Sequence, residues 1–185
     1  ASAWLSGLDE RRVLPEGAEE AAASFGGPLP EEGSGAVDAL RELVGGLDAA
    51  TASPGPRFFH FVTGGVTPAA LGADWLTTAL DQNAFSWVGS PLGTRLETVA
   101  VDWLKQLFEL PAAWSGALTT GATAANFTAL AAARQWWGEE HGRDVGADGA
   151  AGLPATPVLS SGFVHPSARK ALSELGIGRD AVRTF

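Results

Sequence analysis

The stretch Gly116–Asn126 reads Gly-Ala-Leu-Thr-Thr-Gly-Ala-Thr-Ala-Ala-Asn and continues as Ala-rich sequence to Trp137. Its first four residues, 116–119, are small or apolar apart from the final Thr and predict a short buried strand. Residues 120–123, Thr-Gly-Ala-Thr, predict a turn. Apolar side chains then recur at helical spacing, which predicts a helix over residues 124–137. The stretch therefore predicts a strand, a turn and a helix in succession.

The same alternation continues toward the end of the chain. Residues 157–160 predict a second strand, residues 166–175 a helix with Pro at its first position, and residues 181–185 the start of a third strand. Alternating strands and helices predict parallel strands joined by right-handed crossovers, so the fold class is α/β with a mainly parallel sheet. Three strands leave the sheet with an open apolar edge, so we expect further chain to complete it.

The part of the chain before this stretch predicts helices separated by breaks. Residues 15–35 are rich in Pro, Gly and Glu and are typical of a linker. Apolar spacing predicts helices from Val37 to Gly46 or just beyond, over residues 68–81, and over a third segment that ends at Pro111. A Thr followed by Glu three residues later, at 94–97, predicts a capping box that opens this third helix.

Composition excludes several classes of function. The chain has 12 Lys and Arg against 21 Asp and Glu, a net charge of −9, and no basic cluster, which argues against a nucleic-acid partner. It has no Cys, which excludes disulfides, thiolate zinc sites and thiol nucleophiles. The three His are too scattered for a metal site. No apolar run approaches the roughly 18 residues of a membrane span, and we expect a cytoplasmic protein with no membrane partner.

The turn after the first predicted strand is a candidate phosphate site. In open α/β sheets, ligands bind beyond the carboxyl ends of the strands. The small residues Gly121 and Ala122 would let backbone N–H groups approach an anion, and the hydroxyl of Thr123 could donate a hydrogen bond. The start of the helix would add partial positive charge. The alternative is an ordinary helix start with Thr123 as its N-cap.

His165 occupies the corresponding position after the second predicted strand. A histidine there could stack on a planar ligand, donate a hydrogen bond to it, or act as acid or base. The alternative is a His near a helix start with no chemical role. Because both candidate segments would lie at the same edge of adjacent strands, together they favour a phosphorylated aromatic ligand.

Six segments, in order along the chain, resemble motifs of the group II pyridoxal-phosphate-dependent amino-acid decarboxylases, relatives of the aromatic-amino-acid and glutamate decarboxylases. Their spacing is also similar to that of the family, and the resemblance covers essentially the whole chain. The segments are Pro56–Gly65, Asp81–Pro91, Thr94–Thr98, Val101–Leu104, Thr119–Asn126 and Ser160–Ser167.

The resemblance implies the aspartate-aminotransferase-like fold (fold type I), of which this chain would be the N-terminal portion. Residues 1–67 would then be a helical and linker segment involved in dimerisation. Residues 68–185 would form the first part of the large domain that binds pyridoxal 5′-phosphate. The expected assembly is a homodimer with active sites at the subunit interface, or this chain with a complementary C-terminal segment.

The resemblance also assigns roles to individual residues. The phosphate-binding pair of the family falls on Ala122 and Thr123, and its ring-stacking histidine falls on His165, which would be catalytic. The substrate-pocket segments fall on two further stretches, which comprise Phe61, Val62 and Thr63 in the first and Asn83 to Phe85 in the second.

The implied activity is decarboxylation of an L-amino acid to the corresponding amine and CO₂. The lysine that forms the Schiff base with the cofactor, and the Asp that pairs with the pyridine nitrogen, lie further along the family's chains. Lys105 and Lys170, the only lysines here, do not match that lysine. Two alternatives are another fold type I pyridoxal enzyme, such as a carbon–carbon lyase or an aminotransferase, and a non-catalytic truncated paralogue or assembly module.

Overall fold

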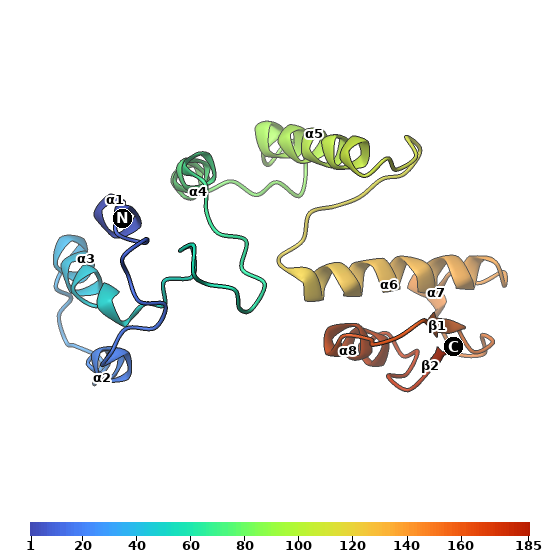
Figure 1. The fold of residues 1–185 in the computed structure, drawn as a ribbon. Coiled ribbons are helices and arrows are strands. Elements are labelled where there is room, and N and C mark those ends of the chain that lie inside the picture. The colour runs from blue at the N-terminus through green and yellow to red at the C-terminus, as the bar shows by residue number, and fades with distance from the viewer. The chain divides into compact units, whose positions relative to one another are not determined.

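The computed structural model describes residues 1–185, which divide into two units, Ala1–Asp81 and Gln82–Phe185. Figure 1 shows their helices and strands. The first unit contains only helices and loops, whereas the second contains helices and a small sheet. The earlier division at residues 67 and 68 is a functional one, between dimerisation and cofactor binding, and it stays a prediction.

Short helices make up the first unit, and two of them lie where the sequence predicts. Thr67 caps the last one, since its Oγ1 accepts a hydrogen bond from the Ala70 N–H at 3.2 Å, and Pro68 occupies the first helical position. The predictions for α3 and α4 are therefore confirmed. The elements are α1 (Ser2–Ser6), α2 (Ala18–Ala23), α3 (Ala36–Gly45), the 3₁₀ helix η1 (Leu47–Ala49) and α4 (Pro68–Leu80).

Helix α2 shows that the prediction of a linker over residues 15–35 is wrong in part. Glu19 and Glu20 occupy its first turn, where carboxylates interact favourably with the partial positive charge of a helix start. The remaining residues of the helix are alanines, which have the highest helix propensity. This local preference outweighs the surrounding glycines and prolines, and the other residues of the segment are largely irregular.

Few side chains of the first unit are buried. Ala52 is buried, and its N–H donates to the Val13 carbonyl at 2.9 Å. By contrast, Leu40 and Val44 on the apolar face of α3 are each 60 % exposed. This helix face therefore has no partner within its own unit.

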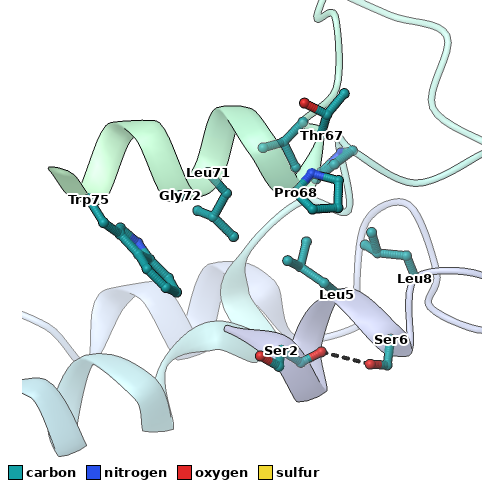
Figure 2. Close-up of a pocket in the computed structure, with 11 residues that line it drawn as sticks. Ser2, Leu5, Ser6, Leu8, Thr67, Pro68, Leu71, Gly72 and Trp75 are labelled. Atoms are coloured by element: carbon teal, nitrogen blue, oxygen red, sulfur yellow. Dashed lines mark hydrogen bonds between the residues drawn. The ribbon is translucent and has the colours of Figure 1, made fainter. Parts of the chain in front are cut away.

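A cavity of about 490 Å³ lies between α1 and α4 in the first unit (Figure 2). Leu5, Leu71 and Trp75 contribute apolar surface to it, and the Ser6 hydroxyl beside it donates to the Ser2 carbonyl at 2.8 Å. No acidic, basic or histidine side chain lines this cavity. It therefore offers no acid–base chemistry.

The second unit has the predicted alternation of helices and parallel strands in its C-terminal half. Strands β1 and β2 pair in parallel, with Val158 opposite Val182 and Ser160 opposite Thr184, and α8 lies between them in sequence. The predictions for both strands and for α8 are confirmed. The elements are α5 (Pro91–Leu107), α6 (Ala122–Glu139), α7 (Val145–Asp148), β1 (Val158–Ser160), α8 (Pro166–Glu174) and β2 (Val182–Thr184).

The prediction of a strand over residues 116–119 is wrong for this structure. These residues are exposed and have no strand neighbour, and the sheet contains only β1 and β2. A strand is defined by hydrogen bonds to its neighbour, which the apolar character of a segment cannot supply. A hydrogen bond from the Leu118 N–H to Glu97 Oε1 at 2.8 Å instead ties the segment to α5.

The predicted capping box is also wrong. Helix α5 begins at Pro91, and its cap is Ser90, whose Oγ accepts from the Gly93 N–H at 3.1 Å. Thr94 therefore lies inside the helix. Glu97 does not return to the start of the helix, because its carboxylate accepts the hydrogen bond from Leu118.

The core of the second unit lies where α8 packs on α6. Ala171, Leu172 and Leu175, in α8 and at its end, are at most 3 % exposed, and Leu172 is the most completely buried of them. Gly138 in α6 and Val145 in α7 are also buried. Close packing of this kind fixes the positions of the two helices relative to one another.

Candidate functional site

The start of α6 presents unpaired backbone donors. Gly121 is its N-cap, with φ 89° and ψ 162°, and no side chain caps it. The first intrahelical bond at this end runs from the Ala125 N–H to the Gly121 carbonyl at 3.1 Å, which leaves the N–H groups of Ala122, Thr123 and Ala124 free. Thr123 lies inside the helix, so the alternative in which Thr123 is the N-cap is wrong.

Gly121 keeps this helix end open. A Cβ at this position would meet no other atom within 4 Å, so the space beside residue 121 is open. Its φ and ψ fall in a region that is essentially restricted to glycine. The Gly121 N–H donates to the Thr119 carbonyl at 2.9 Å, and this turn leads the chain into the helix.

His165 begins α8 and is held by its own helix. It is the N-cap, and its Nδ1 accepts a hydrogen bond from the Ser167 N–H at 3.2 Å. The Ser167 hydroxyl lies 2.8 Å from the same nitrogen. The ring is exposed, and Nε2 has no partner in the chain. A histidine fixed through one nitrogen can present its face and its other nitrogen to a ligand.

Two hydrogen bonds, one at each end, show that α6 and α8 run in the same direction. Asn126, near the start of α6, donates from Nδ2 to the Ser167 Oγ at 2.9 Å. One end of the pair is fixed in this way. At the other end, Arg134 donates to the Leu175 carbonyl at 2.8 Å. The helices therefore run in the same direction, and the open end of α6 and His165 lie at the same end of this helix pair.

Sequence reasoning missed three residues that shape this site. Glu97 holds the segment before Gly121, and Asn126 and Ser167 join the two helix starts. Asn126 follows Thr123 by three residues, a spacing that places both on one face of a helix. Of the three residues, only Asn126 therefore has a signal in the sequence that could have identified it. Nothing local in the sequence indicates the partners of Glu97 or Ser167.

The predicted substrate-pocket residues are divided between the two units. Phe61, Val62 and Thr63 lie in the first unit, where Phe61 and Val62 are almost fully exposed and have φ values of 56° and 50°. Positive φ is rare for aromatic and β-branched residues. Asn83 and Phe85 lie in the second unit, where Asn83 Oδ1 accepts from the Phe85 N–H at 3.1 Å. Their roles in a substrate pocket stay a prediction.

The two lysines pair with acidic side chains of their own helices. Lys105 pairs with Asp102 at 3.1 Å on α5, and Lys170 lies 3.7 Å from Glu174 on α8. No group of three or more His, Asp or Glu side chains is arranged to hold a metal ion. None of the helices is both long enough and apolar enough to span a membrane.

The site fits a ligand that has an anionic group and a flat aromatic ring. Three free N–H groups at the start of an 18-residue helix suit a phosphate, because the helix dipole and the donors act together. The exposed imidazole of His165 at the same end suits a ring. Pyridoxal 5′-phosphate has both groups, so the residues present fit that cofactor.

Comparisons with known proteins identify a family and several similar proteins. A family model described as the pyridoxal-dependent decarboxylase conserved domain matches residues 38–184. An L-2,4-diaminobutyrate decarboxylase of Rhizobium meliloti is 36 % identical over 156 residues, which are 84 % of this chain and 29 % of that protein. An aromatic-L-amino-acid decarboxylase of Rattus norvegicus is 34 % identical over 144 residues, which are 71 % of this chain and 29 % of that protein.

A solved structure shows the same fold. The glutamate decarboxylase domain of a diaminobutyrate-pyruvate transaminase and L-2,4-diaminobutyrate decarboxylase from Vibrio parahaemolyticus superposes with a TM-score of 0.82 at 21 % identity. The superposition covers 99 % of this chain and 41 % of that one. The expected fold type I is confirmed, as an N-terminal portion of it.

The chain spans less than a third of the length of the curated relatives described above. Within that span, the family match extends over most of its residues and includes both candidate segments, the start of α6 and His165. The chain belongs to the pyridoxal-dependent decarboxylase family, whose cofactor is pyridoxal 5′-phosphate.

Proposed function

We propose that the protein containing these residues removes the carboxyl group of an L-amino acid, releasing CO₂ and the corresponding amine. The observation that carries the proposal is the common location of the open α6 start and His165, which Asn126 and Ser167 hold together. Pyridoxal 5′-phosphate, when bound, supplies an electron sink for the bond that breaks at Cα. The residues of this chain would bind the cofactor and hold it in one orientation.

In this proposal the start of α6 binds the phosphate group. The N–H groups of Ala122 and Thr123 donate to phosphate oxygens, the Thr123 hydroxyl adds a further donor, and Gly121 leaves room for the anion. Backbone donors and the helix dipole would provide the positive potential at this helix start.

His165 would lie against the cofactor ring. Its Nδ1 is occupied by Ser167, so the ring face and Nε2 are available to the ligand. A fixed imidazole keeps the cofactor in one orientation, which matters because the bond that breaks must lie perpendicular to the ring plane. The proposal thus gives His165 contact with the cofactor and, at Nε2, a group that can hold a proton.

The substrate pocket would require a second copy of the chain. We propose a homodimer in which the segment from Asn83 to Phe85 reaches the partner's active site and Phe61, Val62 and Thr63 line the pocket. The uncovered apolar face of α3 supports a role for residues 1–67 in dimerisation, because exposed apolar patches often mark interfaces. Residues 68–185 would then be the first part of the cofactor domain.

The substrate would be a small L-amino acid. The relatives named above include enzymes for diaminobutyrate and for aromatic amino acids, so both basic and aromatic amino acids belong in a first screen. The lysine that holds the cofactor covalently would come from outside residues 1–185.

The test compares His165→Ala and Thr123→Ala in the complete protein with His141→Ala as a matched control. His141 lies beyond the C-terminal end of α6, where its Nδ1 contacts the Trp137 carbonyl. CO₂ release from a panel of amino acids and cofactor retention after dialysis are measured for each variant. We expect His165→Ala to lower turnover by about 10²-fold or more, and Thr123→Ala mainly to weaken cofactor retention.

Each outcome has a clear reading. Wild-type turnover in His165→Ala together with wild-type retention in Thr123→Ala would contradict the site. A complete protein that binds the cofactor but releases no CO₂, and instead cleaves another bond or transfers the amino group, would identify a different fold type I enzyme. A complete protein that binds no cofactor would identify a non-catalytic module.

A further inference from the structure

We infer that Asn126 is a positioning residue that acts through Ser167 to hold His165 in a single tautomer, with the ring proton on Nε2. The contacts form a continuous chain from α6 to α8. Asn126 Nδ2 lies 2.9 Å from the Ser167 Oγ, and that oxygen lies 2.8 Å from the His165 Nδ1. A function for this arrangement rests on the proposed role of His165 at the cofactor ring.

The directions of the hydrogen bonds determine the tautomer. The Ser167 N–H, 3.2 Å from the His165 Nδ1, favours Nδ1 as an acceptor, and the Ser167 hydroxyl, 2.8 Å away, strengthens this preference when it donates to Nδ1 and does not accept from it. In a neutral imidazole the ring proton then lies on Nε2. The Asn126 amide N–H likewise donates to the Ser167 Oγ. A hydroxyl that accepts one hydrogen bond can still donate its own proton, so the Ser167 proton can point at Nδ1. The Asn126 amide and the Ser167 hydroxyl therefore donate in one direction, from α6 toward the imidazole.

Burial makes Ser167 suited to this role. Its side chain is only 9 % exposed, whereas His165 is exposed and Asn126 is intermediate. A buried hydroxyl has little water to replace a lost partner, so removal of the Asn126 donor changes what the hydroxyl does.

The placement of Asn126 also links the two halves of the site. It lies three residues after Thr123 on α6, while its hydrogen bond fixes the start of α8. A shift of the phosphate-binding end of α6 would therefore shift the imidazole as well. Groups behind a ligating histidine orient its ring in this way in metal sites.

The experiment measures the tautomer directly in the complete protein without added cofactor. Solid-state NMR of protein with ¹⁵N-labelled histidine reports which ring nitrogen carries the proton, and the His165 signals are assigned by their loss in His165→Gln. We expect the wild type to be protonated at Nε2. We expect Asn126→Asp to reduce this population, because a carboxylate accepts the Ser167 proton and withdraws it from Nδ1.

Three further variants complete the test. Asn126→Ala removes the donor without adding an acceptor, Ser167→Thr keeps the hydroxyl and should keep the tautomer, and Thr128→Ala on the same helix is the matched control. Thr128 is exposed, and its side chain makes no hydrogen bond. In the loaded protein we expect Asn126→Ala to lower kcat about tenfold with little change in KM, the low end of losses seen for groups behind a ligating histidine.

The outcomes separate this inference from the proposed function. An unchanged His165 tautomer in both Asn126 variants would overturn the inference, as would an equal change in Thr128→Ala. If an Asn126 variant unfolds, Asn126→Ser replaces it, because serine is smaller and keeps a donor. The inference requires Asn126→Ser to retain the wild-type tautomer of His165. If the tautomer follows the variants while the complete protein releases no CO₂, the positioning role stands and the proposed decarboxylation fails.

Discussion

Substitution of Gly121 by Ala tests whether the start of α6 binds the cofactor phosphate. The backbone here has φ 89° and ψ 162°, which L residues with a side chain rarely adopt. A Cβ would meet no atom within 4 Å, so crowding adds nothing to the effect. The expected loss is therefore conformational, about 1–3 kcal/mol of the free energy of unfolding for a residue in such a region.

The chain offers a matched control in Gly35. It is the N-cap of α3, with φ 83° and ψ 161°, and a Cβ there also meets nothing within 4 Å. Gly35→Ala and Gly121→Ala should therefore lose similar amounts of stability. Only Gly121 lies at the proposed phosphate site, so only Gly121→Ala should weaken cofactor binding.

The size of the binding effect follows from the free donors. A backbone adjustment that relieves the strain at residue 121 turns the first N–H groups of α6 away from the phosphate. Loss of one hydrogen bond to a charged group costs about 1.5–3 kcal/mol. That loss corresponds to an increase in Kd of about 10- to 150-fold.

The assay is a fluorescence titration of the complete apoprotein with pyridoxal 5′-phosphate, paired with urea unfolding of each variant. The two measurements separate a weaker site from a less stable protein. Equal weakening of cofactor binding in Gly121→Ala and Gly35→Ala would refute the assignment of the phosphate to this helix end.

Two further predictions concern the stability of the second unit. Leu172→Ala should lower the free energy of unfolding by about 2–5 kcal/mol, because Leu172 is only 1 % exposed. Leu159 is 67 % exposed, so the control Leu159→Ala should change the free energy of unfolding little; urea unfolding measures both. Hydrogen bonds from Gln135 and then from the Ala147 N–H hold the pKa of Asp144 below its ordinary value of 3.8. The stabilisation by this carboxylate should be complete above pH 3.8 and lost as the pH falls below it, so the stability difference from Asp144→Ala should shrink in acid; a constant difference would contradict this reasoning.

The elements that sequence analysis predicted correctly are those specified by local signals. Pro68 and Pro166 each occupy the first position of a helix, and Gly176, with φ 72°, follows the end of α8. Apolar spacing specified α6, and alternation of helix and strand specified the parallel pairing of β1 and β2. The proline, glycine and apolar-spacing signals lie within a few residues of the elements that they specify, and the alternation is the order of those elements along the chain.

The elements predicted incorrectly depended on distant partners. Residues 116–119 are apolar enough for a strand, but no neighbouring strand pairs with them here. Glu97 has the correct spacing for a capping box, but Ser90 caps the helix and the Glu97 carboxylate binds Leu118, 21 residues away. Competition between a local and a distant partner cannot be resolved from spacing alone.

The candidate site shows the same division. The sequence by itself determined the residue types that can hold a phosphate and a flat ring, because a glycine-led helix start and a histidine before a proline are local patterns. Only the tertiary structure decided that the two belong to one site. Asn126 and Ser167 are 41 residues apart, and their hydrogen bond exists because packing of α8 on α6 brings the two helix starts together. Such a contact depends on how whole helices bury their apolar faces, which is a property of the folded chain.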